Sequence, residues 1–193
     1  HLYMSRDSVL VAVILIEDPI REDAKDVITQ LHKSGFKHIV MMTGDSERTA
    51  KSVAARVGVD EYFAEVLPED KADYVRRMRE KGHKVIMIGD GVNDAPALSE
   101  ADVGVAVNTG AAIAREIADV TITTEELGAL VTMRRLADAA MRRIHGNYRF
   151  IMSFNSALIA LGVAGFIAPS TSALLHNLST LGIGLKSMTD LLG

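Results

Sequence analysis

Three short polar segments each follow an apolar run in this sequence of 193 residues. They are Thr43-Gly44-Asp45, Pro68-Glu69-Asp70-Lys71 and Gly89-Asp90-Gly91-Val92-Asn93-Asp94. A phosphoryl group is stabilised by hydroxyl and backbone N–H donors, by a lysine acting as a point charge, and by carboxylates that hold Mg²⁺. The three segments together contain all of these groups, so they predict a site for a phosphoryl group and Mg²⁺.

Taken one at a time, two of these segments have ordinary structural interpretations. Thr-Gly-Asp is a common turn and helix cap, and Pro-Glu-Asp-Lys is a usual helix start with acidic residues in its first turn. The third segment differs, because a turn needs one glycine and one Asx residue, whereas this one has two glycines, one asparagine and two aspartates. Asp90 and Asp94 would repel each other unless a cation lay near both. The third segment therefore favours a functional interpretation.

The elements that would position these segments alternate between strand and helix. Short, continuous apolar runs between amphipathic helices are typical of a parallel sheet that is covered on both faces. In such a sheet the ligand lies beyond the carboxyl ends of the strands, where all three segments fall. We therefore expect an α/β fold with a doubly wound parallel sheet. The expected strands are 9–16, 38–42, 62–66, 84–88, 103–107 and 120–123, and the expected helices are 22–34, 47–57, 69–81, 94–101 and 111–118.

Composition excludes some classes of protein. A formal net charge of −4 argues against a general nucleic-acid binder, which needs a basic face, so we expect no nucleic-acid partner. The absence of cysteine excludes a disulfide framework and a thiolate metal site in this chain, and it fits a reducing compartment.

The charged residues are unevenly distributed along the chain. Phe150–Leu185 contains no Asp, Glu, Lys or Arg. Residues 150–168 are long enough to cross a bilayer core of about 30 Å as a helix, and 172–191 would return across it. The expectation is a transmembrane helical hairpin in the lipid bilayer, and the alternative is a pair of core helices in a globular domain.

An arginine cluster precedes this uncharged stretch and indicates its orientation. The positive-inside tendency places the region before the first span, and after a hairpin also the C-terminus, in the cytoplasm. The alternative is that the arginines form the solvated face of a helix. We expect a cytoplasmic domain over 1–146 and two membrane helices within 147–193. The cluster consists of Arg134, Arg135, Arg142, Arg143 and Arg149.

Most of the chain resembles one known family. "MTGDSERTAKSVAARVGV", "VLPEDKADYVRRMREKGHKVIMIGDGVNDAPALSEADVGVAV" and "GAAIAREIADVTI" are similar to the phosphorylation domain of P-type ATPases that transport heavy-metal ions. "VAVILIEDPIREDAKDVITQLHKSGF" resembles the segment that re-enters this domain after the nucleotide-binding insert. "NYRFIMSFNSALIALGVAG" resembles the membrane helix that follows. The resemblance implies a haloacid-dehalogenase-like fold, ATP as substrate, and a multi-pass protein of a prokaryotic plasma membrane.

The resemblance also implies roles for individual residues. Thr43 and the backbone at Gly44 would hold the phosphoryl group, and Asp45 would shape their loop. Lys71 would place its positive charge against the phosphoryl oxygens. In the third segment, Asp90 would ligate Mg²⁺ between Gly89 and Gly91, while Asn93 and Asp94 would complete the phosphoryl and Mg²⁺ site.

Other hallmarks of the family do not occur in these residues. The family's nucleophile is the aspartate of a DKTGT motif, and neither this motif nor the TGE loop nor a Cys-Pro-x motif is present. The chain is therefore expected to be the C-terminal portion of a pump, working with the other domains of that pump. Alone, it is expected neither to hydrolyse ATP nor to move an ion.

A polar group in the second expected span bears on the transported ion. His176 shares a helical face with Ser179 and Thr180, and polar groups in a span are usually functional. The stretch resembles the "HEGGT" sequence of some members of the family, although Asn177 departs from it. Imidazole and oxygen donors suit Zn²⁺, Co²⁺, Mn²⁺ or Cd²⁺ better than Cu⁺. The alternative is a helix-packing stripe.

Two other functions remain open from the sequence. One is a soluble phosphatase or mutase of the haloacid-dehalogenase-like superfamily, with 150–193 as a helical cap. The other is a regulatory module that binds Mg²⁺ and phosphate without catalysis. Partition of the chain into membranes would separate the pump from both.

Overall fold

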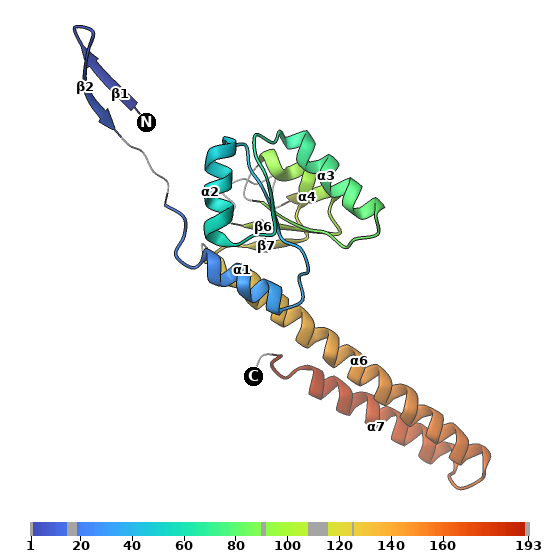
Figure 1. The fold of residues 1–193 in the computed structure, drawn as a ribbon. Coiled ribbons are helices and arrows are strands. Elements are labelled where there is room, and N and C mark those ends of the chain that lie inside the picture. The colour runs from blue at the N-terminus through green and yellow to red at the C-terminus, as the bar shows by residue number, and fades with distance from the viewer. Residues whose placement is uncertain (1, 15–18, 90–91, 108–115, 125, 192–193) are drawn as a thin grey trace. The chain divides into compact units, whose positions relative to one another are not determined.

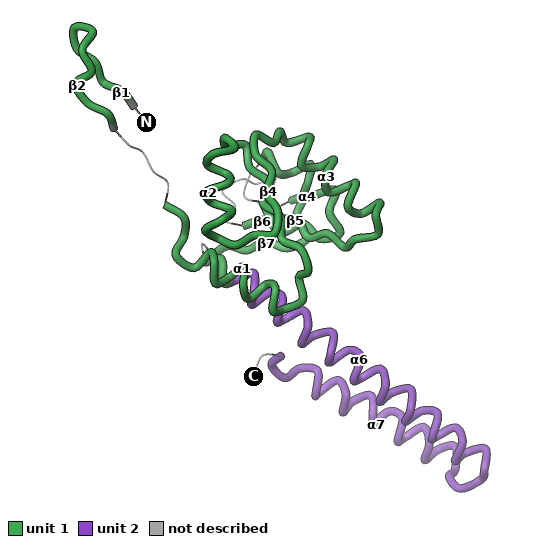
Figure 2. Tube along the Cα trace, viewed as in Figure 1, with its two compact units in different colours: residues 1–128 green, residues 129–193 purple. Residues whose placement is uncertain are grey.

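The computed structural model describes residues 2–14, 19–89, 92–107, 116–124 and 126–191. The chain divides into two compact units, residues 1–128 and residues 129–193 (Figure 2). The domain boundary expected at residue 146 falls inside a continuous helix, and the division into 1–146 and 147–193 stays a prediction. The expected helix over 111–118 lies mostly outside the described residues.

The chain begins with an antiparallel hairpin of β1 (Leu2–Arg6) and β2 (Val9–Ile14) (Figure 1). Asp7 and Ser8 form its two-residue turn with φ angles of 51° and 65°, the left-handed pair that a tight hairpin requires. Large apolar side chains of both strands, such as Tyr3 and Val9, are exposed. The expectation that 9–16 is a buried parallel strand was therefore wrong, because the partner of this run is an antiparallel strand that the sequence reading missed.

Strands β3 (Val40–Met42) and β4 (Glu61–Phe63) pair in parallel. They are linked through helix α2 (Glu47–Val57), which ends at Gly58 with a φ of 82°, a left-handed conformation that glycine adopts without strain. Helix α1 (Ala24–Lys33) precedes β3. Both helices bury one apolar face at helical spacing, which consists of Ala24, Val27 and Leu31 in α1 and of Ala50, Ala54 and Val57 in α2.

A second parallel sheet has the order β5 (Ile86–Gly89), β6 (Val103–Val107), β7 (Val120–Ile122). Its strands are parallel, as expected from the sequence, but they form a sheet separate from that of β3 and β4 instead of one doubly wound sheet. The preceding helix α3 (Pro68–Glu80) begins at a proline, which suits the first helical position because it has no N–H to satisfy. The 3₁₀ turn η1 (Val92–Asp94) leads into α4 (Ala95–Glu100).

One apolar cluster connects the two parallel sheets. It consists of Ala72 and Val75 from α3, Met87 from β5, and Ala97 and Leu98 from α4, with Met42 of β3 packed against it. Met42 directly precedes Thr43, and Ala72 directly follows Lys71. The cluster therefore brings the end of β3 to the first turns of α3, where the predicted site residues lie.

The second unit is a helical hairpin of α6 (Gly128–Val163) and α7 (Pro169–Ser187), which lie side by side (Figure 1). Arg143 of α6 donates hydrogen bonds to the backbone oxygens of Ser187, Thr189 and Asp190, at 3.2 Å for Ser187 and 2.7 Å for Asp190. These carbonyls lie at the end of α7, where a cation satisfies them and the helix dipole.

The helices differ from the two membrane spans expected at 150–168 and 172–191. Among the described residues, no helix is both long enough and apolar enough to cross a membrane, so that expectation is corrected. The uncharged part of α6 extends from Phe150 to the end of the helix at Val163, a length of roughly 20 Å at 1.5 Å per residue. In α7 the apolar sequence is interrupted by His176, Asn177, Ser179 and Thr180.

Candidate phosphoryl site

The loop after β3 is held in place by hydrogen bonds to the loop after β4. The N–H of Thr43 donates to the backbone oxygen of Phe63, and the N–H of Val66 donates back to the oxygen of Thr43, both at 3.0 Å. The Thr43 hydroxyl donates to Oδ2 of Asp45 at 2.9 Å and accepts from the Asp45 N–H at 3.1 Å. Asp45 thus shapes this loop through Thr43, and Gly44 between them is exposed.

Lys71 and Asp94 form an ion pair across 23 residues of sequence. Lys71 Nζ lies 2.7 Å from Asp94 Oδ1, and their side chains are 16% and 12% exposed. Among the residues that the structure describes, Asp94 is the only charged residue that is buried. A carboxylate this far from water requires a cation or several donors, and Lys71 supplies the cation.

Two local features position this ion pair. Asp70, the residue before Lys71, accepts a hydrogen bond from the Leu67 N–H at 3.1 Å. This bond caps the first turn of α3. A Cβ atom at Gly89 would lie 2.6 Å from the Asp94 Cβ, so the side chain of Asp94 rests directly on a backbone that only glycine can provide. Gly89 is therefore a packing requirement of the site.

The remaining predicted residues of this site are placed less fully. Asn93 lies in η1 and is exposed, and Asp90 and Gly91 lie outside the described residues. Within the described residues, no group of three His, Cys, Asp or Glu side chains could hold a metal ion. Mg²⁺ is commonly held by one or two carboxylates together with waters and phosphate oxygens. The oxygen donors at this edge, Asp94 above all, fit that chemistry.

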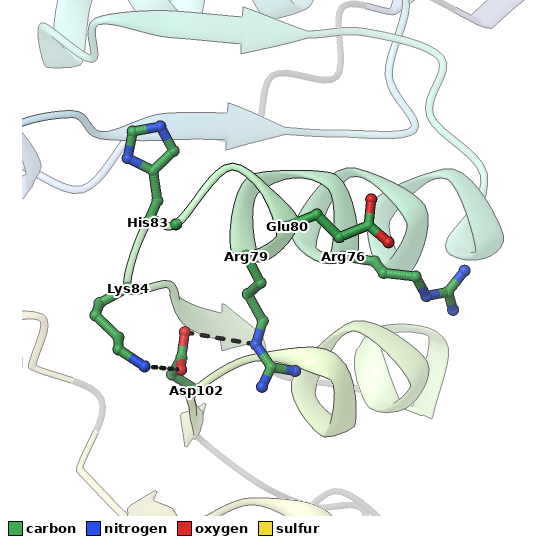
Figure 3. A pocket seen from close by; sticks show the side chains of 7 residues that line it. Arg76, Arg79, Glu80, His83, Lys84 and Asp102 are labelled. Carbon is green, nitrogen blue, oxygen red and sulfur yellow. Dashed lines mark hydrogen bonds and ion pairs between the residues drawn. The ribbon is translucent and has the colours of Figure 1, made fainter.

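A separate hollow of about 350 Å³ lies at the other end of β5 (Figure 3). Three of its charged residues pair with one another: Asp102 lies 2.8 Å from Lys84 Nζ and 3.5 Å from Arg79 Nε, and it also accepts a hydrogen bond from the Val85 N–H at 3.0 Å. The hydrogen bond from Lys84, and after it the one from Val85, lower the pKa of Asp102. These contacts connect α3, β5 and β6, so we interpret the hollow as structural.

The predicted polar group in α7 is partly engaged by its own helix. Ser179 and Thr180 donate their hydroxyls to the backbone oxygen of His176 at 2.7 and 3.1 Å. His176 Nδ1 lies 2.9 Å from Asn155 Oδ1 on α6, and Asn177 is exposed. The sequence reading missed Asn155, although an amide within an uncharged apolar stretch is a signal that could have identified it.

Comparison with known proteins identifies a family and several relatives. Residues 4–102 match the pattern of haloacid dehalogenase-like hydrolases, and residues 72–133 match a second pattern of the same description. A manganese-exporting P-type ATPase of Mycobacterium leprae is 42% identical over 96% of this chain and 26% of its own length. Copper-transporting ATPase 1 of Rhizobium meliloti is 44% identical over 90% of this chain and 21% of its own length.

A solved structure agrees with these relatives. A zinc-transporting PIB-type ATPase in its E2.Pi state has a TM-score of 0.86 at 31% sequence identity, over 94% of this chain and 30% of that one. The chain thus spans about a quarter of the length of the curated relatives it matches.

Proposed function

Because the chain belongs to the haloacid dehalogenase-like hydrolase family, we propose that it is the part of a metal-exporting P-type ATPase that holds the phosphoryl group during transport. The observation that carries this proposal is the buried ion pair of Lys71 and Asp94 at 2.7 Å. A lysine and a carboxylate that are both shielded from water interact strongly with a charged ligand, because little solvent screens them.

The groups of this site are paired with one another in the structure. Lys71 binds Asp94, and the Thr43 hydroxyl binds Asp45. A phosphoryl group would form an ion pair with the ammonium of Lys71 and would accept a hydrogen bond from the Thr43 hydroxyl. Mg²⁺, when bound, would be held by Asp94 together with Asp90 and would neutralise phosphoryl oxygens. Asn93 would donate from its side-chain amide.

The attacking carboxylate is proposed to lie outside these 193 residues, since the DKTGT motif does not occur in them. The chain alone would then form no phosphoenzyme from ATP. A phosphatase would need the same nucleophile, and the two relatives reported above are named as a metal exporter and a metal transporter, which favours the pump.

We propose a divalent transition-metal ion as the transported substrate, with His176 as one of its ligands. The relatives are named for manganese and copper and the solved structure for zinc, so the ion itself has to be measured. Imidazole nitrogen favours Zn²⁺, Co²⁺, Mn²⁺ or Cd²⁺ over Cu⁺, which prefers sulfur. Asn177, Ser179 and Thr180 would contribute oxygen atoms. Export crosses a lipid bilayer, and residues 1–128 would work in the cytoplasm, where ATP is available.

The proposal is tested by ATP hydrolysis in the pump that contains this chain. The rate of ATP hydrolysis is measured with Zn²⁺, Co²⁺, Mn²⁺, Cd²⁺ and Cu⁺ in turn, each with and without Mg²⁺. We expect stimulation by a divalent ion, dependence on Mg²⁺, and a weakened response in His176→Ala. Hydrolysis that no metal ion stimulates would contradict the export function, and an unchanged response of His176→Ala would contradict the ligand role alone.

A further inference from the structure

A single hydrogen bond between α6 and α7 determines which nitrogen of His176 is available. Nδ1 of His176 lies 2.9 Å from Oδ1 of Asn155. The amide oxygen of Asn155 can only accept a hydrogen bond. The proton of this bond must therefore be on Nδ1 of His176. In a neutral imidazole the other nitrogen, Nε2, then has a lone pair.

The hydrogen bond to Asn155 leaves Nε2 as the ring nitrogen of His176 that can bind a ligand. Within the described part of the chain, Nε2 of His176 has no hydrogen-bond partner, and the residue is exposed. The lone pair of Nε2 is therefore unused and accessible.

We propose that Asn155 is the positioning residue of His176, which it holds in the tautomer whose Nε2 binds a divalent transition-metal ion. The proposal rests on the proposed function for the identity of the ion as transported substrate. Asn155 itself does not contact the ion. It fixes the proton and the ring orientation, which is how hydrogen-bond partners of ligating histidines increase their affinity for metals.

A second asparagine of the same helix provides a matched control. Asn147 of α6 also bonds across to α7, with Nδ2 3.0 Å from Oγ of Ser187. Removing either asparagine breaks one interhelical hydrogen bond, but only Asn155 contacts the imidazole. A purely structural role would make the two variants equivalent.

The tautomer is measured first, without metal, by two-bond ¹H–¹⁵N correlation on the ¹⁵N-histidine-labelled chain, with the His176 signals assigned from His176→Gln. We expect the Nδ1–H tautomer in the wild type and in Asn147→Ala, and a mixed or reversed tautomer in Asn155→Ala. Asn155→Asp keeps an acceptor and should restore the wild-type pattern. An Nε2–H tautomer in the wild type, or an unchanged one in Asn155→Ala, would overturn the proposal.

The second measurement uses Zn²⁺ as the probe in the pump that contains this chain. In Asn155→Ala we expect the Zn²⁺ concentration for half-maximal ATP hydrolysis to rise about tenfold or more, with the maximal rate unchanged. Asn155→Asp should recover most of this loss, and Asn147→Ala should stay within about twofold of the wild type, since a bond that does not touch the ligand leaves metal affinity intact.

The two possible failures can be told apart. If His176→Ala responds to Zn²⁺ like the wild type, the ligand role in the proposed function fails, whatever Asn155 does to the tautomer. If His176→Ala loses the response while Asn155→Ala keeps it, or if Asn147→Ala loses it equally, the positioning role of Asn155 fails and the ligand role stands.

Discussion

Lys71 Nζ lies 2.7 Å from Asp94 Oδ1, and Lys84 Nζ lies 2.8 Å from Asp102 Oδ1, so these two lysine–aspartate pairs have nearly equal lengths. They differ in exposure, because the Lys71 side chain is 16% exposed and that of Lys84 is 89% exposed. Water therefore screens the attraction within the Lys84–Asp102 pair more strongly than the attraction within the Lys71–Asp94 pair. The two pairs are therefore internal controls for each other.

The coupling energy of the two pairs should differ clearly. We predict that Lys71→Met or Asp94→Ala alone costs about 3 kcal/mol of unfolding free energy, because each leaves a buried charge without its partner. The coupling in the double-mutant cycle should exceed about 1.5 kcal/mol for Lys71–Asp94. It should stay below about 1 kcal/mol for Lys84→Met with Asp102→Ala. Urea unfolding of the seven proteins measures both cycles, and equal couplings would contradict the burial argument.

Gly89 should not tolerate a methyl group. In Gly89→Ala the new Cβ would lie 2.6 Å from the Asp94 Cβ, so the backbone or Asp94 must move. We predict a loss of about 1–3 kcal/mol in unfolding free energy, measured by urea unfolding. Gly146→Ala in α6 is the control, because nothing lies within 4 Å of its Cβ and alanine favours a helix. A wild-type stability of Gly89→Ala would disprove the close packing.

The sequence was most informative where local signals agreed with the fold. The helix 47–57 and the strand 103–107 were predicted with their observed bounds, since a glycine stops the first and a short apolar run defines the second. Lys71 and Asp94 were expected in one site because the segments that carry them follow strands of a parallel sheet. Their direct pairing was not predictable, because it depends on the position of α3 relative to η1.

Other features could not be read from the sequence. The turn of the first hairpin uses Asp7 and Ser8 with positive φ and no glycine, so the usual signal of a tight turn is missing. The partnership of Asn155 and His176 depends on the register of two helices joined by a turn. Helix α6 ends at Val163, so its apolar part is shorter than the helix over 150–168 that the sequence predicted.

Asp102 should make the thermal stability of the chain depend on pH. Hydrogen bonds from Lys84 and Val85 lower the pKa of Asp102 in the folded chain below its ordinary value of about 4. Its contribution to stability is therefore present above that ordinary value and is lost as the pH falls through the lower, folded-state pKa. Thermal unfolding followed from about pH 6 to pH 3 should show a smaller decrease in Tm for Asp102→Asn than for the wild type.

Glu80 provides the control for this pH dependence. It lines the same hollow, is exposed, and has no ion-pair partner in the described part of the chain. Glu80→Gln should follow the wild-type curve. If Asp102→Asn also ran parallel to the wild type, the pairing of Asp102 would not be a source of acid sensitivity.

The central claim is that Lys71 holds the phosphoryl group of a P-type ATPase, and phosphoenzyme formation tests it most directly. The pump containing this chain is incubated with Mg²⁺ and γ-labelled ATP, and acid-stable label is counted for the wild type, Lys71→Ala and Lys81→Ala. Lys81 is a matched control, an exposed lysine that follows the other end of α3. We predict wild-type label in Lys81→Ala, a loss of about 100-fold or more in Lys71→Ala, and none in the 193-residue chain alone. Equal labelling of Lys71→Ala and Lys81→Ala would contradict the account.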